Sequence, residues 1–372
     1  MINLLYTCSC TDVSGYSESS RNYICALNTQ KDKINLAVKN VKFEPFKSDH
    51  SYYSGIIDPL IGRQITPDVQ IIHMTPENFP LHRRSNIKNI GYTTYETALP
   101  KKWVTLCNTM DEIWVPSQWN VGVFQESGVK VPVKVVEHTF EMEQYKNIPD
   151  LDLEIPKDKF VFYSIFQWTE RKNPVGLIRA FLSEFGRNDN VILVLKTYRQ
   201  NSSIEDQKWI ESQIQAVKAG MYIDDHAQVM LIHKNLTRPE ILSLHKQGHC
   251  LVSPHKAEGW GQVCTDALAV GSPAIATGYS GNTQFMTPDN SYLLDYTMEP
   301  CHSMPWPIYS GKGSSVWANP DICQLRSYMR EIFNDYKSAL AKAEIAKADV
   351  EKLNWDSIGS KMASELDRIL KR

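Results

Sequence analysis

Short apolar runs alternate along the chain with segments in which apolar residues recur at helical spacing. This alternation is typical of α/β folds, in which short buried strands are joined by helices and form mostly parallel sheets. In the first half, strands are predicted at residues 2–8, 68–74, 112–117 and 131–138. A short helix follows the third of these strands and ends at Gly128, because glycine readily takes the left-handed conformation that stops a helix.

The second half starts the same alternation again. Predicted strands lie at residues 160–166, 191–197, 228–234, 250–255 and 273–278. Predicted helices lie at residues 174–185, 206–220, 238–248, 261–271 and 352–372. Two of these helices have proline in their first turn, where its missing N–H would have no partner in any case. The pattern predicts a doubly wound sheet with helices on both faces.

The chain length of 372 residues is enough for two domains of ordinary size, each with its own core. Residues 146–158 are polar, contain prolines and show no period, so they are predicted to form a linker. The expected domains are therefore residues 1–145 and 159–350, followed by a closing helix at 351–372. Doubly wound sheets bind ligands at the carboxyl ends of their strands, so a cleft between the two halves is the expected site.

Composition excludes several classes of protein. With 40 Lys and Arg against 42 Asp and Glu, the net charge is −2, which predicts neither a strongly basic nucleic-acid surface nor an acidic tail. No apolar run approaches the roughly 20 residues of a membrane helix, and the N-terminus lacks the basic region of a signal peptide. The eight cysteines form no C-x-x-C pair, which argues against a zinc ribbon or a disulfide framework and favours reduced thiols in the cytoplasm.

Residues 255–282 carry the strongest chemical signal. Gly259 and Gly261 follow a predicted strand and let the backbone approach a ligand closely. The helix that begins there offers free N–H groups and a partial positive charge, which suit a phosphate. Glu258 precedes the helix and Asp266 lies more than a turn into it, and a carboxylate that accepts two neighbouring hydroxyls recognises a sugar or ribose ring. The predicted ligand is a sugar diphosphate, although a strand, turn and helix with incidental acids would give the same spacing.

The stretch HKAEGWGQVCTDALAVGSPAIATGYSGN resembles the nucleotide-sugar motif of retaining glycosyltransferases of family 4. The resemblance implies the GT-B fold, with two facing Rossmann-like domains and a last helix that crosses back to the first domain. It also implies that Glu258 contacts the donor sugar and that Asp266, which replaces the family's second glutamate, contacts the ribose. The other donor-binding residues that it implies are Gly259, Trp260, Gly261 and Gln262.

A second segment, SIFQWTERKNPVGLIRAF, resembles the part of the family in which an Arg and a Lys neutralise the donor diphosphate. Many members have an Arg where this chain has Gln167, so the resemblance assigns the positive charge to Arg171 and Lys172, together with Lys196. Lys256 stands where related chains often have an Arg. Cations at such places stabilise the charge that develops on a leaving diphosphate, although an Arg-Lys pair before a helix is also a common solvated surface feature.

Four residues of the first half are weaker candidates. His73 ends a predicted strand, where several family members place a histidine near the sugar, and His138 matches a histidine at the end of the domain's last strand. Gly15 lies in a segment that resembles the loop opening the family's first helix. Glu96 belongs to a G-Y-x-x-x-E block and is a candidate for orienting the acceptor. A structural role is an open interpretation for each of the four.

The resemblance implies an enzyme that transfers a sugar from a UDP- or GDP-linked donor to an acceptor hydroxyl with retention of configuration. The departing phosphate oxygen would take the proton of the incoming hydroxyl, so positioning and electrostatics matter more than a strong protein base. No metal or other cofactor is expected, since the one Asp-x-Asp spacing, Asp150 to Asp152, falls in the predicted linker. A non-catalytic nucleotide-sugar-binding protein and a sugar-nucleotide epimerase remain open on the same scaffold.

The acceptor is the least constrained part of this hypothesis. A glycan or a glycolipid precursor is expected, and two basic clusters of the first half, residues 81–88 and 100–103, could meet a phosphate-bearing acceptor. They also keep open a DNA-base glycosyltransferase of viral type that acts on hydroxymethyl-pyrimidine. The expected location is the cytoplasm, at a membrane surface for a lipid acceptor or in the host cell for a viral enzyme. The oligomeric state is not predicted.

Overall fold

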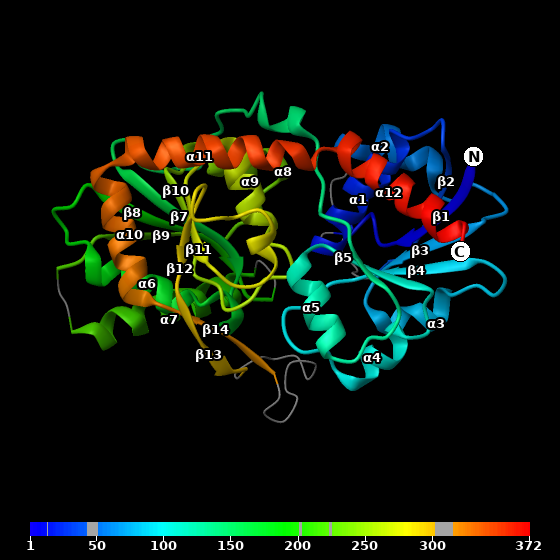
Figure 1. Cartoon of the computed structure of the whole chain (residues 1–372). Helices are drawn as coiled ribbons and strands as arrows, with labels where there is room; N and C mark the ends of the chain where they lie inside the picture. Colours follow the sequence, from blue (N-terminus) through cyan, green and yellow to red (C-terminus); the bar gives the residue numbers. More distant parts are fainter. Residues whose placement is uncertain (13, 43–50, 201–202, 223–224, 302–314) are drawn as a thin grey trace. The chain divides into compact units, whose positions relative to one another are not determined.

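The computed structural model describes the whole chain except residues 13, 43–50, 201–202, 223–224 and 302–314. The chain divides into two compact units (Figure 1). The first unit contains Met1–Met142 together with Lys352–Arg372, and the second contains Glu143–Glu351. Residues 146–158, expected as a linker, are part of the second unit and consist of turns and irregular chain.

The first unit is built on a parallel sheet of six strands in the order β2-β1-β3-β4-β5-β6. Its strands are β1 (Ile2–Cys8), β2 (Ile34–Asn40), β3 (Val69–His73), β4 (Lys88–Tyr92), β5 (Glu112–Val115) and β6 (Val133–Val135). Its helices are α1 (Gly15–Asn28), α2 (Ser51–Ile57), α3 (Phe79–His82), α4 (Lys101–Cys107), α5 (Gln118–Glu126) and α12 (Trp355–Leu370), with 3-10 turns η1 (Asp58–Leu60) and η2 (Pro76–Asn78). Strand β3 is buried at every position, as expected for a parallel sheet that is covered on both faces.

The C-terminal helix α12 completes the core of the first unit by packing on α1 (Figure 1). The two helices approach so closely that a Cβ at Gly359 would lie 2.1 Å from the backbone oxygen of Ala26. Near the other end of α12, Arg368 Nη2 lies 2.5 Å from Oε1 of the fully buried Glu112. Because a buried carboxylate without a partner is strongly unfavourable, this ion pair anchors α12 on the unit.

The second unit contains a parallel sheet of six strands in the order β12-β11-β10-β7-β8-β9 and an antiparallel pair of strands. The sheet strands are β7 (Phe160–Gln167), β8 (Val191–Tyr198), β9 (Gln228–Ile232), β10 (Cys250–Ser253), β11 (Ala274–Thr277) and β12 (Tyr292–Leu294), and the pair is β13 (Tyr296–Pro300) and β14 (Val316–Pro320). The helices are α6 (Pro174–Glu184), α7 (Ile204–Met221), α8 (Arg238–Gln247), α9 (Gln262–Val270), α10 (Ile322–Asn334) and α11 (Tyr336–Val350). The 3-10 turns η4 (Glu170–Lys172) and η5 (Gly281–Gln284) lie in this unit, whereas η3 (Met142–Tyr145) and η7 (Glu351–Leu353) include the points where the chain passes between the units.

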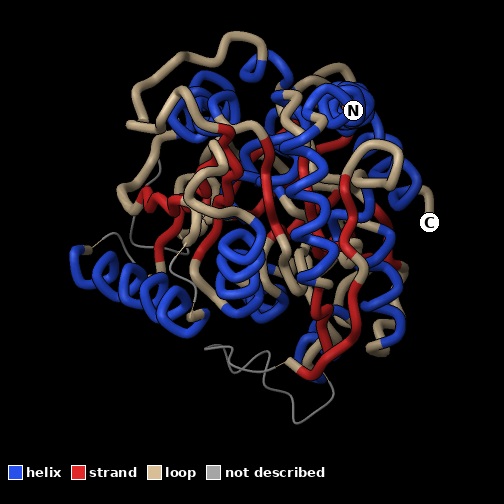
Figure 2. Tube along the Cα trace, turned by 90° about the vertical axis from the view of Figure 1, so that its left-hand side faces the viewer, coloured by secondary structure: helices blue, strands red, loops and turns tan. Residues whose placement is uncertain are grey.

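Helices cover both faces of the second sheet (Figures 1 and 2). Helix α6 packs on both α7 and α10 in one layer, and α9 packs on both α8 and α11 in the other. The first three strands of this unit run from the centre to one edge and the next three to the opposite edge, which is the Rossmann strand order. The predicted fold class, doubly wound α/β with two parallel sheets, is therefore confirmed.

Candidate active site

The second sheet reverses its strand order between β7 and β10, which are neighbours at its centre. Loops that leave two such strands diverge to opposite faces, and the crevice between them at the carboxyl ends is where doubly wound sheets bind ligands. Arg171 and Lys172 lie in η4 after β7, and Glu258 lies in the loop after β10. The topology therefore brings these three predicted residues to the same sheet edge.

The carboxylate of Glu258 is bound by both cations of η4. Lys172 Nζ is in close contact with Oε1, and Arg171 Nη1 lies 3.2 Å from Oε2. Arg171 also donates to the backbone oxygen of Ala257 at 2.7 Å, and its own backbone oxygen accepts from the N–H of Lys256 at 2.7 Å. Main-chain and side-chain bonds thus fix the two loops against each other.

The cluster is shielded from water, and its charges hold Glu258 in the ionised form. The exposed fractions of the Glu258, Lys172 and Arg171 side chains are 11%, 17% and 18%. Burial alone would raise the pKa of Glu258, but Lys172 and Arg171 outweigh burial and hold this pKa at about 2. Glu258 is therefore ionised at neutral pH and pairs with both cations.

Helix α9 begins four residues after Glu258 without a capping side chain. Gly261 is the N-cap residue with φ +94°, a left-handed conformation that favours glycine, and no side chain bonds the first turn. The amides of Gln262 and Val263 find no acceptor among the residues that the structure describes. The helix start thus presents free N–H groups and the positive end of the helix dipole, which an anion can use.

Two glycine-containing loops approach each other beside this helix start. Gly281 N–H donates to the backbone oxygen of Glu258 at 2.9 Å, and a Cβ at Gly281 would lie 2.1 Å from the backbone oxygen of Gly259. The N–H of Glu258 donates to Ser280 Oγ at 2.7 Å. Trp260, another predicted donor-binding residue, is only 3% exposed, and its ring centre lies 4.7 Å from that of Phe285. Substituting Gly281 would therefore displace the loop that carries Glu258.

Lys196 is a third cation on this side of the sheet. It lies on β8 in register with Ile165 of β7 and is 6% exposed. Its Nζ lies 5.7 Å from the ring centre of Tyr198, and no carboxylate pairs with it in the described part of the chain. Burial lowers the pKa of Lys196 to about 8, so the side chain is mainly charged at neutral pH. A buried cation without a counter-ion is unfavourable, and a bound anion would relieve that cost.

Asp266, the predicted ribose ligand, is buried in α9 and already has protein partners. Arg238, in the first turn of α8, binds it with two hydrogen bonds, from Nη1 to Oδ2 at 2.6 Å and from Nη2 to Oδ1 at 2.8 Å. The hydroxyl of Tyr145 donates to Oδ1 at 2.7 Å. Burial raises the pKa of Asp266, but Arg238 and the hydrogen bonds lower it below its usual range. The carboxylate is therefore ionised and shared with an arginine.

Lys256, a predicted donor-binding residue, is buried and already paired with two carboxylates of the protein. It is 4% exposed, and its Nζ lies 2.8 Å from Glu170 Oε1 and 2.5 Å from Glu299 Oε1. It also lies 5.4 Å from the ring centre of Trp317. Burial lowers the pKa of Lys256, but the two carboxylates raise it above its usual value. Two acids of the same chain neutralise this lysine, which ties η4 to the β13–β14 pair.

In the first unit, His73 ends β3 inside a cluster of hydroxyl groups. Its Nδ1 lies 2.9 Å from Tyr6 OH and 3.1 Å from Ser20 Oγ, and its Nε2 lies 3.5 Å from Ser19 Oγ. The residue is 1% exposed, and burial holds the pKa of His73 well below its usual range. A neutral imidazole with both nitrogens bonded inside the protein suits packing, and this environment does not support the predicted contact with a sugar.

The other candidates of the first unit differ in exposure. The ring of His138 meets the ring of Tyr23 edge-on at 5.8 Å, and burial lowers the pKa of His138 to about 3. Gly15 is the exposed first residue of α1, and a Cβ there would meet no atom within 4 Å. Glu96 is half-buried in the loop after β4. Tyr23 also contacts His73, so the two histidines belong to one aromatic cluster.

Three residues near the candidate site were not predicted. Arg238 follows a capping box at Thr237, so its position indicates only an ordinary first helical turn. Tyr145 is distant in sequence from its partner Asp266. His255 is fully buried, its two ring nitrogens have no partner among the described residues, and burial lowers its pKa to about 4. One signal in the sequence could have indicated Arg238: the aspartate at position 266 is shorter than the glutamate of the family and leaves room for a guanidinium group.

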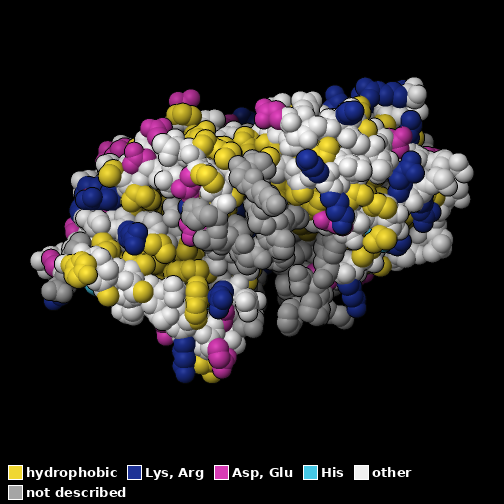
Figure 3. Space-filling model, turned by 90° about the horizontal axis from the view of Figure 1, so that it is seen from below, with side chains coloured by type: hydrophobic (Ala, Val, Ile, Leu, Met, Phe, Trp, Pro, Cys, Tyr) yellow, Lys and Arg dark blue, Asp and Glu magenta, His cyan; other side chains and the backbone are white. Residues whose placement is uncertain are grey.

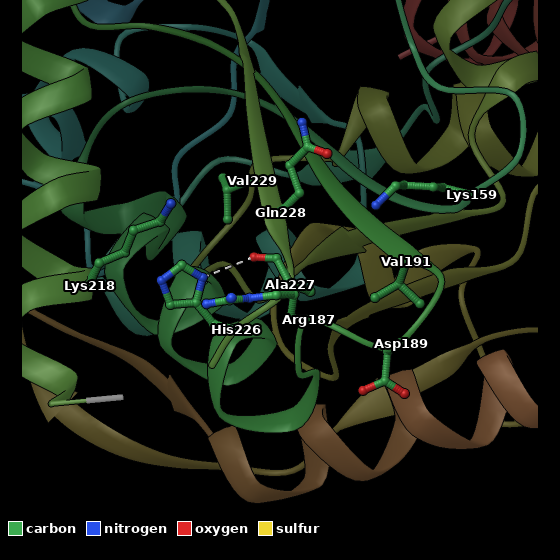
Figure 4. A pocket seen from close by; sticks show the side chains of 9 residues that line it. All are labelled: Lys159, Arg187, Asp189, Val191, Lys218, His226, Ala227, Gln228 and Val229. Atoms are coloured by element: carbon green, nitrogen blue, oxygen red, sulfur yellow. Dashed lines mark hydrogen bonds between the residues drawn. The ribbon is translucent and has the colours of Figure 1, made fainter. Parts of the chain in front are cut away.

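A cavity of about 280 Å³ lies at the opposite edge of the second sheet (Figure 4). Lys159 precedes β7, Val191 begins β8 and Gln228 begins β9, so this cavity is at the amino ends of the strands. Lys218 of α7 and His226 also line it. Because doubly wound sheets bind their substrates at the carboxyl ends, the cavity is not part of the candidate active site.

Metal and membrane features were not found in the part of the chain that the structure describes. No three His, Cys, Asp or Glu side chains gather there as a metal ion would require. None of the helices in the described ranges is both long and apolar enough to cross a membrane. All eight cysteines are free thiols.

Comparisons with known proteins agree with this geometry. Residues 150–296, which contain the cluster around Glu258, match the family described as Glycosyl transferases group 1. A sequence comparison with curated proteins found no match. Among solved structures, HepE (Alr3699) of Anabaena in complex with UDP and glucose is similar, with a TM-score of 0.69, 12% identity, and coverage of 99% of this chain and 100% of that chain.

Two further solved structures are similar over the whole chain. Sucrose-phosphate synthase of Thermosynechococcus elongatus has a TM-score of 0.70 and 12% identity, and 100% of each chain is covered. An α,α-trehalose-phosphate synthase (UDP-forming) of Burkholderia xenovorans, in complex with glucose-6-phosphate, has a TM-score of 0.68 and 10% identity, with 99% of this chain and 100% of that chain covered. At such low identity these structures establish a shared fold and leave the substrates open.

Proposed function

We propose that this protein, a glycosyltransferase by its group 1 domain and a GT-B protein by its fold, transfers a sugar from a nucleoside-diphosphate sugar to an acceptor hydroxyl with retention of configuration. The resemblance to glycosyltransferase family 4 seen in the sequence is confirmed by the match over residues 150–296. The structures of HepE contain UDP with glucose and UDP-glucose, so UDP-linked hexoses are the first donors to test.

The observation that carries this proposal is the group of three cations with little exposure near the carboxyl ends of β7 and β8, beside the loop that follows β10. Lys172, Arg171 and Lys196 are cations with little exposure, and Glu258 is the carboxylate that pairs with two of them. Lys196 has no carboxylate partner among the described residues, and the negative diphosphate of a sugar nucleotide would supply an anionic partner. The free amides at the start of α9 add further donors. Charges fixed in place before the reaction stabilise a leaving diphosphate most where water is excluded.

The reaction follows from these groups. The diphosphate takes Lys172 and Arg171 as partners, and Glu258 then accepts hydrogen bonds from hydroxyls of the donor sugar. The bond between the anomeric carbon and the phosphate oxygen breaks, and its electron pair goes to the diphosphate, whose charge the cations stabilise. The acceptor hydroxyl attacks from the same face, and its proton passes to the departing oxygen. Because the pKa of Glu258 is about 2, the protein contributes charge and position here and not acid catalysis.

The first experiment is a thermal-shift screen against UDP-, GDP- and ADP-linked sugars, because a donor that binds only the folded state raises its melting temperature. Donors that stabilise the protein are then incubated with candidate acceptors, and the anomeric configuration of the product is determined by NMR. Retention supports the proposal, and clean inversion contradicts it. Binding without any turnover or hydrolysis favours a binding protein, and conversion of the donor without acceptor favours an epimerase. We expect the rate to be unchanged by a chelator, since side-chain cations supply the positive charge.

We propose a glycan or glycolipid precursor as the acceptor. Arg83, Arg84, Lys101 and Lys102 of the first unit are exposed, and Figure 3 shows Lys and Arg side chains over the right-hand end of the face, where the first unit lies. A phosphate-bearing acceptor matches such a surface. DNA binding that weakens steeply with salt would instead favour a nucleic-acid acceptor. The free cysteines suit a reducing compartment, so we place the enzyme in the cytoplasm.

A further inference from the structure

Asp266 has little hydrogen-bonding capacity left for a ligand. A carboxylate offers about four acceptor positions, two on each oxygen. Oδ1 accepts from Arg238 Nη2 at 2.8 Å and from Tyr145 OH at 2.7 Å, and Oδ2 accepts from Arg238 Nη1 at 2.6 Å. The protein thus fills three positions, and one position remains on Oδ2.

Arg238 is itself held in place by several contacts. Its Nε donates to Gln144 Oε1 at 3.0 Å, and its Nη2 donates to Tyr145 OH at 3.0 Å. Its guanidinium carbon lies 5.8 Å from the ring centre of Tyr145. A planar guanidinium that bonds a carboxylate at two points and also bonds two further side chains is a rigid partner. Moving it away from Asp266 would break several hydrogen bonds at once.

We propose that Arg238 and Tyr145 are positioning residues that leave Asp266 a single acceptor, so that the donor ribose is held there through one hydroxyl. This inference rests on the proposed function and extends it with the ribose contact that the resemblance to family 4 implies for Asp266. A carboxylate without these partners could accept from both neighbouring hydroxyls of the ribose. Here the second hydroxyl finds no free acceptor position on Asp266. The aspartate also fits this arrangement, because its side chain is one methylene shorter than glutamate and leaves space for the guanidinium.

The test compares the binding of UDP, 2′-deoxy-UDP and 3′-deoxy-UDP by isothermal titration calorimetry, with the matching GDP and ADP series in parallel. One deoxy analogue is expected to bind at least about tenfold more weakly, because it lacks a hydrogen bond to a charged group, and the other less than about threefold more weakly. Large losses for both analogues, or for neither, would overturn the inference while leaving the proposed function intact. If no nucleoside diphosphate binds, the proposed function fails and this inference with it.

Tyr145→Phe provides the sharper test, because it removes the hydroxyl, keeps the ring and frees a second acceptor position on Oδ1. The analogue that the unmodified enzyme tolerates should now bind about tenfold more weakly than the parent nucleotide. Arg238→Lys keeps the charge without the two-point contact, and it should also weaken the binding of the tolerated analogue relative to the parent nucleotide. Tyr222→Phe is the matched control, since Tyr222 is 95% exposed, and it should leave the relative affinities for the three nucleotides unchanged. An equal loss for all three nucleotides in Tyr145→Phe would mean a merely structural tyrosine and would overturn the inference.

Discussion

Two clusters of buried polar side chains lie at corresponding places, at the carboxyl ends of central strands of the two sheets. The cluster in the first unit is neutral and closed. His73 bonds Tyr6 and Ser20, and the hydroxyls of Tyr23 and Tyr92 bond each other and a backbone oxygen. Burial raises the pKa of both tyrosines and lowers the pKa of the histidine, so none of these groups is charged at neutral pH. Such a cluster needs no ligand.

The cluster in the second unit is charged and open. Lys196 has no carboxylate partner among the described residues, and helix α9 starts at Gly261 without a capping side chain. By contrast, α1 of the first unit is capped by Ser14, whose side chain accepts from Ser17 N–H. The difference teaches that burial and a strand-end position do not by themselves mark a ligand site. Uncompensated charge and unsatisfied donors do, because an arriving anion removes their cost.

The largest effect that would test this contrast is expected for Lys172→Ala. If Lys172 stabilises the leaving diphosphate as proposed, its removal should lower kcat by about 100- to 1,000-fold. The fold should persist, because Arg171 still pairs with Glu258. The measurement is kcat at saturating donor, with Lys208→Ala, an exposed lysine of α7, as the matched control. A kcat within threefold of the unmodified enzyme would remove Lys172 from the reaction.

Lys196→Met should have the next largest effect. Loss of a charged contact to the diphosphate is expected to weaken donor binding by about 10- to 100-fold. Because the pKa of Lys196 is about 8, donor affinity of the unmodified enzyme should fall as the pH rises through 8, whereas affinity of the variant should lack this step. Calorimetric titrations between pH 6.5 and 9.5 measure both. The same pH step in both proteins would show that another group causes it.

The free energy of unfolding should depend on the charge of Lys196 as well, but it should rise with pH where the donor affinity falls. Its pKa is lowered from 10.5 to about 8 in the folded protein. Between these pH values the unfolded chain binds a proton that the folded chain does not, so the free energy of unfolding rises with pH. The difference between the two pKa values corresponds to about 3 kcal/mol, which Lys196→Met should recover at neutral pH. Urea unfolding of both proteins at pH 7.5 and pH 10 tests this. The variant should be the more stable protein by a larger margin at pH 7.5, and an equal margin at both pH values would contradict the prediction.

His73→Ala tests the closed cluster. It leaves a cavity and hydroxyl groups without a partner, so the free energy of unfolding should fall by about 2–3 kcal/mol. The activity of the molecules that remain folded should change less than threefold. Urea unfolding and kcat/KM are measured together, with the partly exposed His82→Ala as the control in the same unit. Normal stability with a hundredfold loss of activity would instead place His73 at the substrate.

Much of the fold could be predicted from the hydrophobic pattern. The strands predicted at residues 160–166 and 191–197 are β7 and β8, which are continuous apolar runs because both faces of the sheet are covered. Strand β4 was not predicted, because Asn89 and Gly91 interrupt its short apolar run. The glycine is required there by packing, since a Cβ at Gly91 would lie 2.6 Å from the ring of Phe79. A local pattern cannot show a requirement that a distant residue imposes.

The same limit applies to the candidate site. The approach of Glu258 to Lys172 could be predicted, because both residues follow strands that doubly wound sheets place side by side. The partners of Lys256 could not, because Glu299 lies on the antiparallel pair β13–β14, outside the repeating pattern. Arg238 was missed for a similar reason: its partner Asp266 lies on another helix, and only the three-dimensional structure brings the two together.

The smallest expected effect is that of Gly15→Ala, and it tests whether the first unit also offers a substrate surface. A Cβ at Gly15 meets no atom within 4 Å, and the residue opens helix α1, so alanine should raise the free energy of unfolding by about 0.5 kcal/mol. Gly55→Ala in α2, where a Cβ also meets nothing, is the matched control. Stability is measured by urea unfolding and activity by kcat/KM for the acceptor. Unchanged activity in both variants would agree with the contrast between a closed cluster in the first unit and an open one in the second. A tenfold loss confined to Gly15→Ala would mean that a substrate touches the start of α1, and the closed character of the first unit would then end at His73 and its neighbours.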